Sequence, residues 1–121
     1  MKTYFLDTYA LIEILKENEN YKIYKKGILT TTKMNLLELH YYILRNVDEK
    51  TADEIYKTFK DITTDIEDED YIEASKLKYN YKKNKLSFVD CIGYVKAIKQ
   101  NMKFLTGDNQ FKEMKNVEFV K

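Results

Sequence analysis

The sequence predicts an α/β protein whose mostly parallel sheet is covered by helices on both faces. Short apolar runs typical of buried strands, such as KTYFL at 2–6 and KFLT at 103–106, alternate with longer segments whose apolar residues have helical spacing. Strands that alternate with helices form parallel sheets, because a parallel neighbour is reached through a helical crossover. With 121 residues and no linker or repeat, the chain is expected to fold as a single domain over 1–121.

The first half of the chain is predicted to contain two strands and three helices. A helix follows the strand at 2–6, and ILT at 28–30 forms a second strand. Thr31 or Thr32 then caps a helix that ends near Arg45, and a third helix follows over 48–59. One face of the middle helix is expected to carry Met34, Leu37, Tyr41 and Leu44.

The second half is predicted to end in two further strands. KDITTD at 60–65 is a possible short strand, and the helix at 67–83 is acidic at its start and lysine-rich at its end, which complements the helix dipole. Ser87 caps the next helix, which runs to about residue 101. KFLT then forms a strand, Gly107 a turn before a short helix, and VEFV at 117–120 the last strand.

The composition excludes several classes of protein. The formal net charge of +1 gives no bulk attraction for nucleic acid, so any such binding needs a local patch. No apolar run approaches the roughly eighteen residues of a membrane helix, and the start of the chain lacks the apolar region of a secretory signal. The single cysteine, Cys91, leaves no partner for a disulfide or a cysteine-cluster zinc site. We therefore expect a cytoplasmic protein without membrane contact.

Four isolated acidic residues stand in apolar surroundings. Asp7 directly follows the first predicted strand, and Asp108 follows KFLT after a single glycine. Both are therefore placed at carboxyl ends of strands, the edge at which open parallel sheets have their ligand crevice. Glu38 lies among apolar residues of its helix, and Asp90 lies within the first turn of another. A divalent metal would resolve the cost of burying these charges, because Mg²⁺ takes hard oxygen ligands and retains waters.

Each of these acids also has a local explanation. Asp90 is the third helical residue of a capping-box-like Ser87–Asp90 pair, and Asp108 fits an ordinary Gly-Asp-Asn turn. Asp7 is placed to cap the first helix, and Glu38 can reach out of the core to solvent. Only the presence of all four in one architecture favours a common site.

The motifs that carry these acids resemble those of PIN-domain ribonucleases, particularly the VapC-type toxins of prokaryotic toxin–antitoxin pairs. The matching stretches are FLDTYALIE, NLLELHYYI, LSFVDCIGYVKA and FLTGDNQF, in order over nearly the whole chain. The resemblance implies a three-layer α/β/α sandwich in which Asp7, Glu38, Asp90 and Asp108 bind Mg²⁺ or Mn²⁺ and hydrolyse RNA. It also implies a cognate antitoxin as partner and a homodimer.

The same resemblance suggests a role for two threonines, and the sequence differs from the family in its shortage of arginine. Thr106 matches the hydroxyl residue that precedes the last acid in the family, and it is expected to support a carboxylate or a metal-bound water; a routine strand threonine is the alternative. Thr8, beside Asp7, has the same two interpretations. Arg45 is the only arginine, whereas many relatives have arginines near the site, so RNA is expected to be held by lysine.

Lysines Lys82, Lys83 and Lys85 are the candidates for RNA contact. They precede the helix that carries Asp90, and tyrosines interleave with them, so phosphates can pair with the ammonium groups while unpaired bases stack on the rings. A solvated helix end is the alternative interpretation.

Other motifs point to structure rather than chemistry. His40 is the only histidine and is expected near an interface of packed elements, while Cys91 is expected to pack as a small apolar group. The acidic run DIEDED at 65–70 is expected to be a solvated helix start.

A housekeeping RNA-processing nuclease and a non-catalytic binding module with the same fold remain as alternative functions.

Overall fold

A four-stranded, fully parallel sheet forms the centre of the computed structural model, which describes all residues 1–121. The strand order is β2-β1-β3-β4. In this order β1 pairs with both β2 and β3, and Phe5 lies opposite Thr30 on one side and Phe104 on the other. The strands are β1 (Thr3–Leu6), β2 (Ile28–Thr30), β3 (Lys103–Thr106) and β4 (Val117–Phe119).

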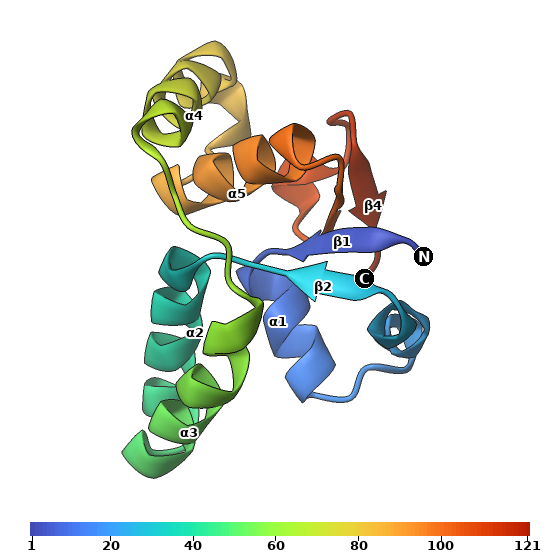
Figure 1. The fold of residues 1–121 in the computed structure, drawn as a ribbon, viewed down its shortest axis with the longest axis vertical. Helices are drawn as coiled ribbons and strands as arrows, with labels where there is room; N and C mark the ends of the chain where they lie inside the picture. Colours follow the sequence, from blue (N-terminus) through green and yellow to red (C-terminus); the bar gives the residue numbers. More distant parts are fainter.

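Helices cover both faces of this sheet and so form the expected three layers (Figure 1). One layer contains α1 (Thr8–Leu15), α2 (Lys33–Asn46) and α3 (Glu49–Phe59), and the other contains α4 (Asp68–Asn80) and α5 (Phe88–Lys99). Short 3₁₀ helices η1 to η4 complete the connections at Glu19–Lys26, Lys60–Ile62, Lys82–Asn84 and Asn109–Phe111. No helix is both long and apolar enough to cross a membrane.

The alternation of side chains along the strands creates two separate cores. Tyr4 and Leu6 of β1 face the layer of α1, α2 and α3, whereas Phe5 between them faces α4 and α5. In β3, Leu105 joins the first core and Phe104 the second, where its ring stacks on Phe5 at 5.7 Å. Each inner strand is therefore apolar on both faces, as a parallel sheet covered by helices requires.

The segment predicted as a strand at 60–65 is not one. Residues 60–62 form η2, and only a single bridge joins Thr63 to Thr31. The segment is held instead by hydrogen bonds beside the end of β2, where the Thr30 hydroxyl donates to the Ile62 carbonyl at 2.7 Å. The chain crosses from one helical layer to the other at this point, and this leaves no length for a regular strand.

Of the predicted apolar face of α2, only Met34 packs against a core, and the other three residues lie outside it. Leu37, Tyr41 and Leu44 are 63%, 60% and 42% exposed, whereas Leu36, Leu39 and Ile43 are buried against α1 and α3. Apolar residues occur on two sides of this helix, so its sequence fits either orientation. Packing decided between them, and it left an exposed apolar strip on α2.

The acidic run at 65–70, which extends into the first turn of α4, contains one fully buried member, so the expected solvated helix start is wrong for Asp70. The Asp70 carboxylate accepts from Lys96 at 2.9 Å and from Lys99 at 2.7 Å, both on α5. Burial raises the pKa of Asp70, but hydrogen bonds from Lys99, from the Glu67 backbone and from Lys96 lower that pKa more, to about 2. This ion pair joins α4 to α5 inside the second layer.

Candidate active site

Asp7 and Asp108 lie where the sheet topology reverses. From β1 the chain passes through α1 to β2 on one side, whereas β3 lies on the other side of β1. Such a switch point opens a crevice at the carboxyl ends of the two strands, and it is the usual ligand position in open α/β sheets. The two acids follow the ends of β1 and β3, so the topology brings them together as predicted.

Asp7 is buried at this edge, with 3% of its surface exposed. Its Oδ1 accepts from the Ala10 backbone N–H at 2.9 Å, which caps α1, and its Oδ2 accepts from the Thr106 hydroxyl at 2.5 Å. Thr106 Oγ1 also accepts from the Asp108 backbone N–H at 3.0 Å. Thr106 therefore connects the acids that follow β1 and β3.

Thr8 orients Glu38 through a hydrogen bond between α1 and α2. The Thr8 hydroxyl donates to Glu38 Oε1 at 2.6 Å, and it accepts from Asn35 Nδ2 at 3.2 Å. Asn35 is buried and is held in turn by the Thr32 hydroxyl, which donates to its Oδ1 at 2.6 Å. The half-buried Glu38 therefore points toward α1 rather than freely into solvent.

Asp90 and Asp108 form local turns and still keep an oxygen free. Asp90 Oδ2 accepts from the Ser87 N–H at 2.9 Å, which completes a capping box for α5, and Asp108 Oδ1 accepts from the Gln110 N–H at 3.0 Å. No protein hydrogen bond reaches Asp90 Oδ1, Asp108 Oδ2 or Glu38 Oε2. The local explanations and the common site are therefore compatible, because capping leaves the other oxygens available.

Gly107 holds the Asp108 turn close to the rest of the edge. A Cβ on this residue would lie 2.3 Å from the Val120 carbonyl oxygen and 2.3 Å from the Tyr9 ring. Only a glycine fits between these two groups.

The acids share one electrostatic environment. Burial, with further contributions from the charges of Asp90 and Asp108, raises the pKa of Asp7 to about 7 despite its hydrogen bonds. Burial and the charge of Asp90 also raise the pKa of Glu38, and burial and the charge of Asp108 raise that of Asp90. Each carboxylate thus raises the cost of ionising another, and none of the four forms an ion pair with a lysine or arginine. A bound cation would relieve this repulsion.

The donor set fits Mg²⁺ or Mn²⁺. It consists of hard carboxylate and hydroxyl oxygens without a thiolate or imidazole at the edge. No three acidic, histidine or cysteine side chains converge closely enough to enclose an ion by themselves. Mg²⁺ does not need such a cage, because it keeps several waters and binds through one or two carboxylates.

Two polar residues near the candidate site were not predicted from the sequence. Asn35 is buried and donates to Thr8, so it is part of the support of Glu38; a polar residue near a helix start gives no signal of this role. Lys78 on α4 is the cation whose charge lowers the pKa of Asp90, against the larger effect of burial. The signal for Lys78 is absent from local sequence, since α4 and α5 meet only in the tertiary fold.

The three predicted RNA-contacting lysines lie together at the exposed end of α4. Lys82 and Lys83 belong to η3, and Lys85 follows it; all three are exposed. Asn84 in the same turn donates to the Gln110 carbonyl at 3.0 Å, which fixes η3 beside the Asp108 turn.

His40 and Cys91 have the structural positions expected of them. His40 Nε2 lies 2.7 Å from Asp53 Oδ1, at the packed interface of α2 and α3. Cys91 is fully buried in the second core.

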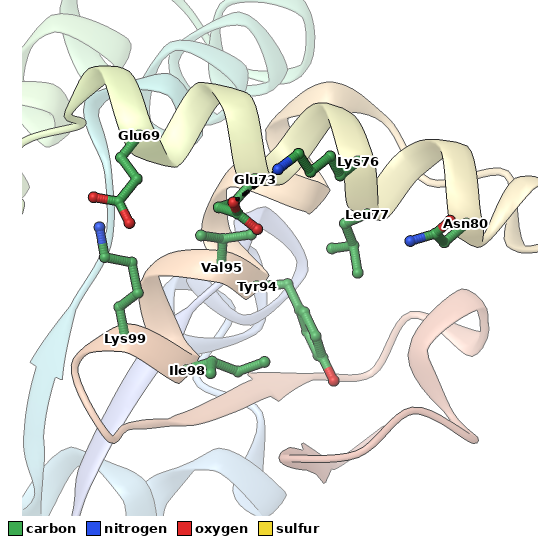
Figure 2. Close-up of a pocket in the computed structure, with 9 residues that line it drawn as sticks. All are labelled: Glu69, Glu73, Lys76, Leu77, Asn80, Tyr94, Val95, Ile98 and Lys99. Atoms are coloured by element: carbon green, nitrogen blue, oxygen red, sulfur yellow. Dashed lines mark hydrogen bonds and ion pairs between the residues drawn. The ribbon is translucent and has the colours of Figure 1, made fainter.

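The largest surface cavity lies away from the acids. It has a volume of about 490 Å³ and opens between α4 and α5 (Figure 2). Leu77, Tyr94, Val95 and Ile98 form its apolar part, with charged side chains around them. None of the four acids lines this cavity, so the candidate site does not coincide with it.

Fold and site together define a class: three-layer α/β proteins with a carboxylate cluster at the topological switch point. Within that class, the PIN domain family model matches residues 4–117, and the chain belongs to the PIN domain family. No curated protein matches the sequence significantly.

Solved structures similar to this chain include three from toxin–antitoxin systems. A toxin-antitoxin complex from Klebsiella pneumoniae has a TM-score of 0.74 at 17% identity, with 95% of each chain covered. Sarcin-Ricin loop cleaving toxin VapC20 from Mycobacterium tuberculosis has a TM-score of 0.79 at 14% identity, with 97% of this chain and 96% of that chain covered. For DNA-bound VapBC from Salmonella typhimurium the TM-score is 0.73 at 14% identity, with 99% and 98% covered. At these identities the likeness establishes the fold, and it extends over the full domain.

Proposed function

We propose that this PIN domain is a metal-dependent endoribonuclease and the toxin of a toxin–antitoxin pair. One observation carries the proposal: four carboxylates from four segments are linked by mutual charge repulsion around the switch point, and none of them forms an ion pair with a lysine or arginine. Acids that repel one another at a partly buried edge lower the stability of the fold. A divalent ion that serves in hydrolysis gives them a function that offsets this cost.

The four acids have distinct roles in this proposal. Asp7, Glu38 and Asp90 would hold the principal Mg²⁺ or Mn²⁺ directly or through waters, and Asp108 would support that ion or a second one. When bound, the ion supplies an activated water and stabilises negative charge on the phosphate. The hydroxyl of Thr106 keeps Asp7 Oδ2 in place, and that of Thr8 keeps Glu38 Oε1 in place, so both threonines are positioning residues.

An antitoxin is the partner that best fits the exposed strip on α2. Leu37 directly precedes Glu38, Tyr41 follows it three residues later on the same helix, and the two are 63% and 60% exposed. An amphipathic segment of a partner laid on this strip would bury apolar surface and cover the approach to Glu38 at the same time. Similarity to structures described as toxin–antitoxin complexes supports the same partner. A homodimer and a cytoplasmic location belong to the same proposal.

Cleavage of a mixed RNA pool tests the activity. Wild-type protein with Mg²⁺ or Mn²⁺ is expected to cut RNA, and EDTA or the folded double variant Asp7→Asn, Asp90→Asn is expected to abolish cutting. Equal cleavage by the double variant would refute the site. If the wild type binds RNA and never cuts it, the non-catalytic module becomes the better description. A gene for a small DNA-binding protein beside this one distinguishes a toxin from a housekeeping nuclease.

A further inference from the structure

Phe88 is an exposed aromatic residue that the fold does not use. It begins α5, two residues before Asp90, and 60% of its surface is exposed. Burial of a phenylalanine side chain stabilises a folded protein, and this position obtains little of that gain. One exposed aromatic residue is ordinary on a protein surface, so its surroundings decide whether it has a use.

The second observation is the lysine that lies against its ring. Lys78 Nζ is 5.1 Å from the centroid of the Phe88 ring, and it donates a hydrogen bond to the Leu86 carbonyl. No carboxylate forms an ion pair with Lys78. An ammonium group has three N–H donors, so two remain for another acceptor. The half-buried Lys78 is therefore a positioned, unpaired cation beside an open aromatic ring.

A second lysine lies against an aromatic ring nearby: Lys82, at the start of η3, contacts Tyr79 near the end of α4. Lys82 Nζ lies 4.2 Å from the centroid of the Tyr79 ring, and Tyr79 is 68% exposed. The turn that carries Lys82 is hydrogen-bonded to the segment after Asp108 through Asn84. Alternating cations and open aromatic rings are the composition of surfaces that bind single-stranded nucleic acid.

We propose that Phe88 and Lys78 bind one nucleotide next to the cleaved bond: its unpaired base stacks on the Phe88 ring, and its phosphate contacts the Lys78 ammonium. The inference rests on the proposed ribonuclease function and narrows its substrate to RNA with an unpaired nucleotide at the cleavage position. A base inside a duplex has no free face for such stacking. A phosphate fits this surface better than a protein segment, because neither Lys78 nor Lys82 forms an ion pair with an acidic side chain of the protein.

Stacking is measured without cleavage by titrating the wild-type protein, in EDTA, into a short single-stranded RNA that contains 2-aminopurine. The fluorescence of this base falls when it stacks on an aromatic ring. Binding is expected to quench the signal. Phe88→Ala should remove most of the quenching and weaken binding about 10-fold, and Phe88→Trp should preserve both. Ile98→Ala is the matched control, because Ile98 is 49% exposed on the last turn of the same helix.

Lys78 is tested through the salt dependence of the same binding. Lys78→Met should reduce the slope of log affinity against log salt by about 0.7, the value for one phosphate contact on a single strand, while Lys78→Arg should preserve it. Circular dichroism of each variant confirms that the fold is unchanged.

The outcomes separate this inference from the proposed function. Quenching that depends on Phe88 supports the inference even if the wild type never cuts RNA. Metal-dependent cleavage together with equal quenching and affinity in Phe88→Ala overturns the inference and leaves the nuclease intact. Absence of quenching by the wild type also overturns it, and so does a Phe88→Ala protein that loses only its affinity for a partner protein.

Discussion

At the residue scale, the site acids combine a local structural role with exposure to one another's charge. Asp7 caps α1, Asp90 caps α5 and Asp108 closes a turn, and each does so with part of its carboxylate. The local explanation is therefore correct for these three acids, whereas Glu38 points toward α1 and not freely into solvent. The candidate site depends on the common edge at which the remaining charge of the four acids accumulates.

Asp7 should make the metal-free protein less stable as the pH rises. Its pKa is about 7 in the folded protein against 3.8 as the ordinary value, so the folded state holds its proton more tightly. The protonated Asp7 makes its full contribution to the free energy of unfolding below about pH 4. This contribution, on the order of 4 kcal/mol, is lost as the pH rises through 7. Asp7→Asn should remove this loss, so in EDTA the variant should exceed the wild type in urea-unfolding free energy at pH 8 but not at pH 4. A constant difference between the two proteins would contradict the assignment.

Thr106 should matter for metal binding through the position of Asp7. Thr106→Val removes the hydroxyl that donates to Asp7 Oδ2 and accepts from the Asp108 backbone, whereas Thr106→Ser keeps it. We expect Thr106→Val to weaken Mn²⁺ binding and RNA cleavage about 10- to 100-fold. Isothermal titration with Mn²⁺ and an initial-rate assay measure the two effects. Retained affinity in the valine variant would show that Thr106 is a routine strand residue.

At the scale of elements, a buried ion pair holds α4 to α5 in addition to apolar packing. Asp70 accepts from two lysines of α5, and one of them, Lys96, is itself buried at 4% exposure. Because Asp90 and Phe88 begin α5 while Lys78 belongs to α4, this ion pair contributes to holding the candidate RNA surface together.

Asp70→Asn should therefore destabilise the protein by about 3 kcal/mol at pH 7, since it leaves the buried Lys96 without its counter-charge. The Asp70 pKa is about 2 in the folded protein, below its ordinary value of 3.8, so its contribution is present above about pH 4 and is lost as the pH falls toward 2. Chemical denaturation at pH 7 and pH 2.5 measures both effects. The exposed Asp68→Asn is the control and should change stability by less than about 0.5 kcal/mol. A similar cost for both variants would remove the special role of Asp70.

At the scale of the whole molecule, the sheet separates two helical layers that each supply one helix-borne acid. Glu38 comes from α2 in one layer and Asp90 from α5 in the other, while Asp7 and Asp108 follow the strands between them (Figure 1). The site therefore depends on the correct docking of both layers. The exposed strip of α2 lies on the first layer and gives a partner access to the Glu38 side of the site.

Charge placed on that strip should weaken binding of the proposed antitoxin. The double variant Leu37→Lys, Tyr41→Lys should cleave RNA like the wild type but bind the proposed antitoxin about 30-fold more weakly, because two apolar contacts are lost. Ile23→Lys is the control, since Ile23 is 70% exposed on η1, away from α2. Inhibition titrations and calorimetry measure the change. Inhibition of the double variant equal to that of the control would place the antitoxin elsewhere.

Most of the strands and helices could be predicted from local sequence. The strand at the start of the chain, the cap at Ser87 and the KFLT strand were all predictable, because strand runs and capping side chains act over a few residues. The sequence narrowed the cap of α2 to Thr31 or Thr32, and the structure has Thr32 there. The four acids were visible for the same reason, as isolated charges at strand ends or in apolar helix segments.

Only the tertiary structure decided how those segments face one another. Apolar residues occur on two sides of α2, so packing against α1 and α3, and no local rule, chose Leu36, Leu39 and Ile43 for the core. The partners of Asp70 and the place of Lys78 beside Phe88 join helices that are distant in sequence, and pairwise contacts of this kind leave no periodic signal. The sequence by itself determined which groups are available for chemistry, and the docking of the two layers on the sheet determined which of them meet.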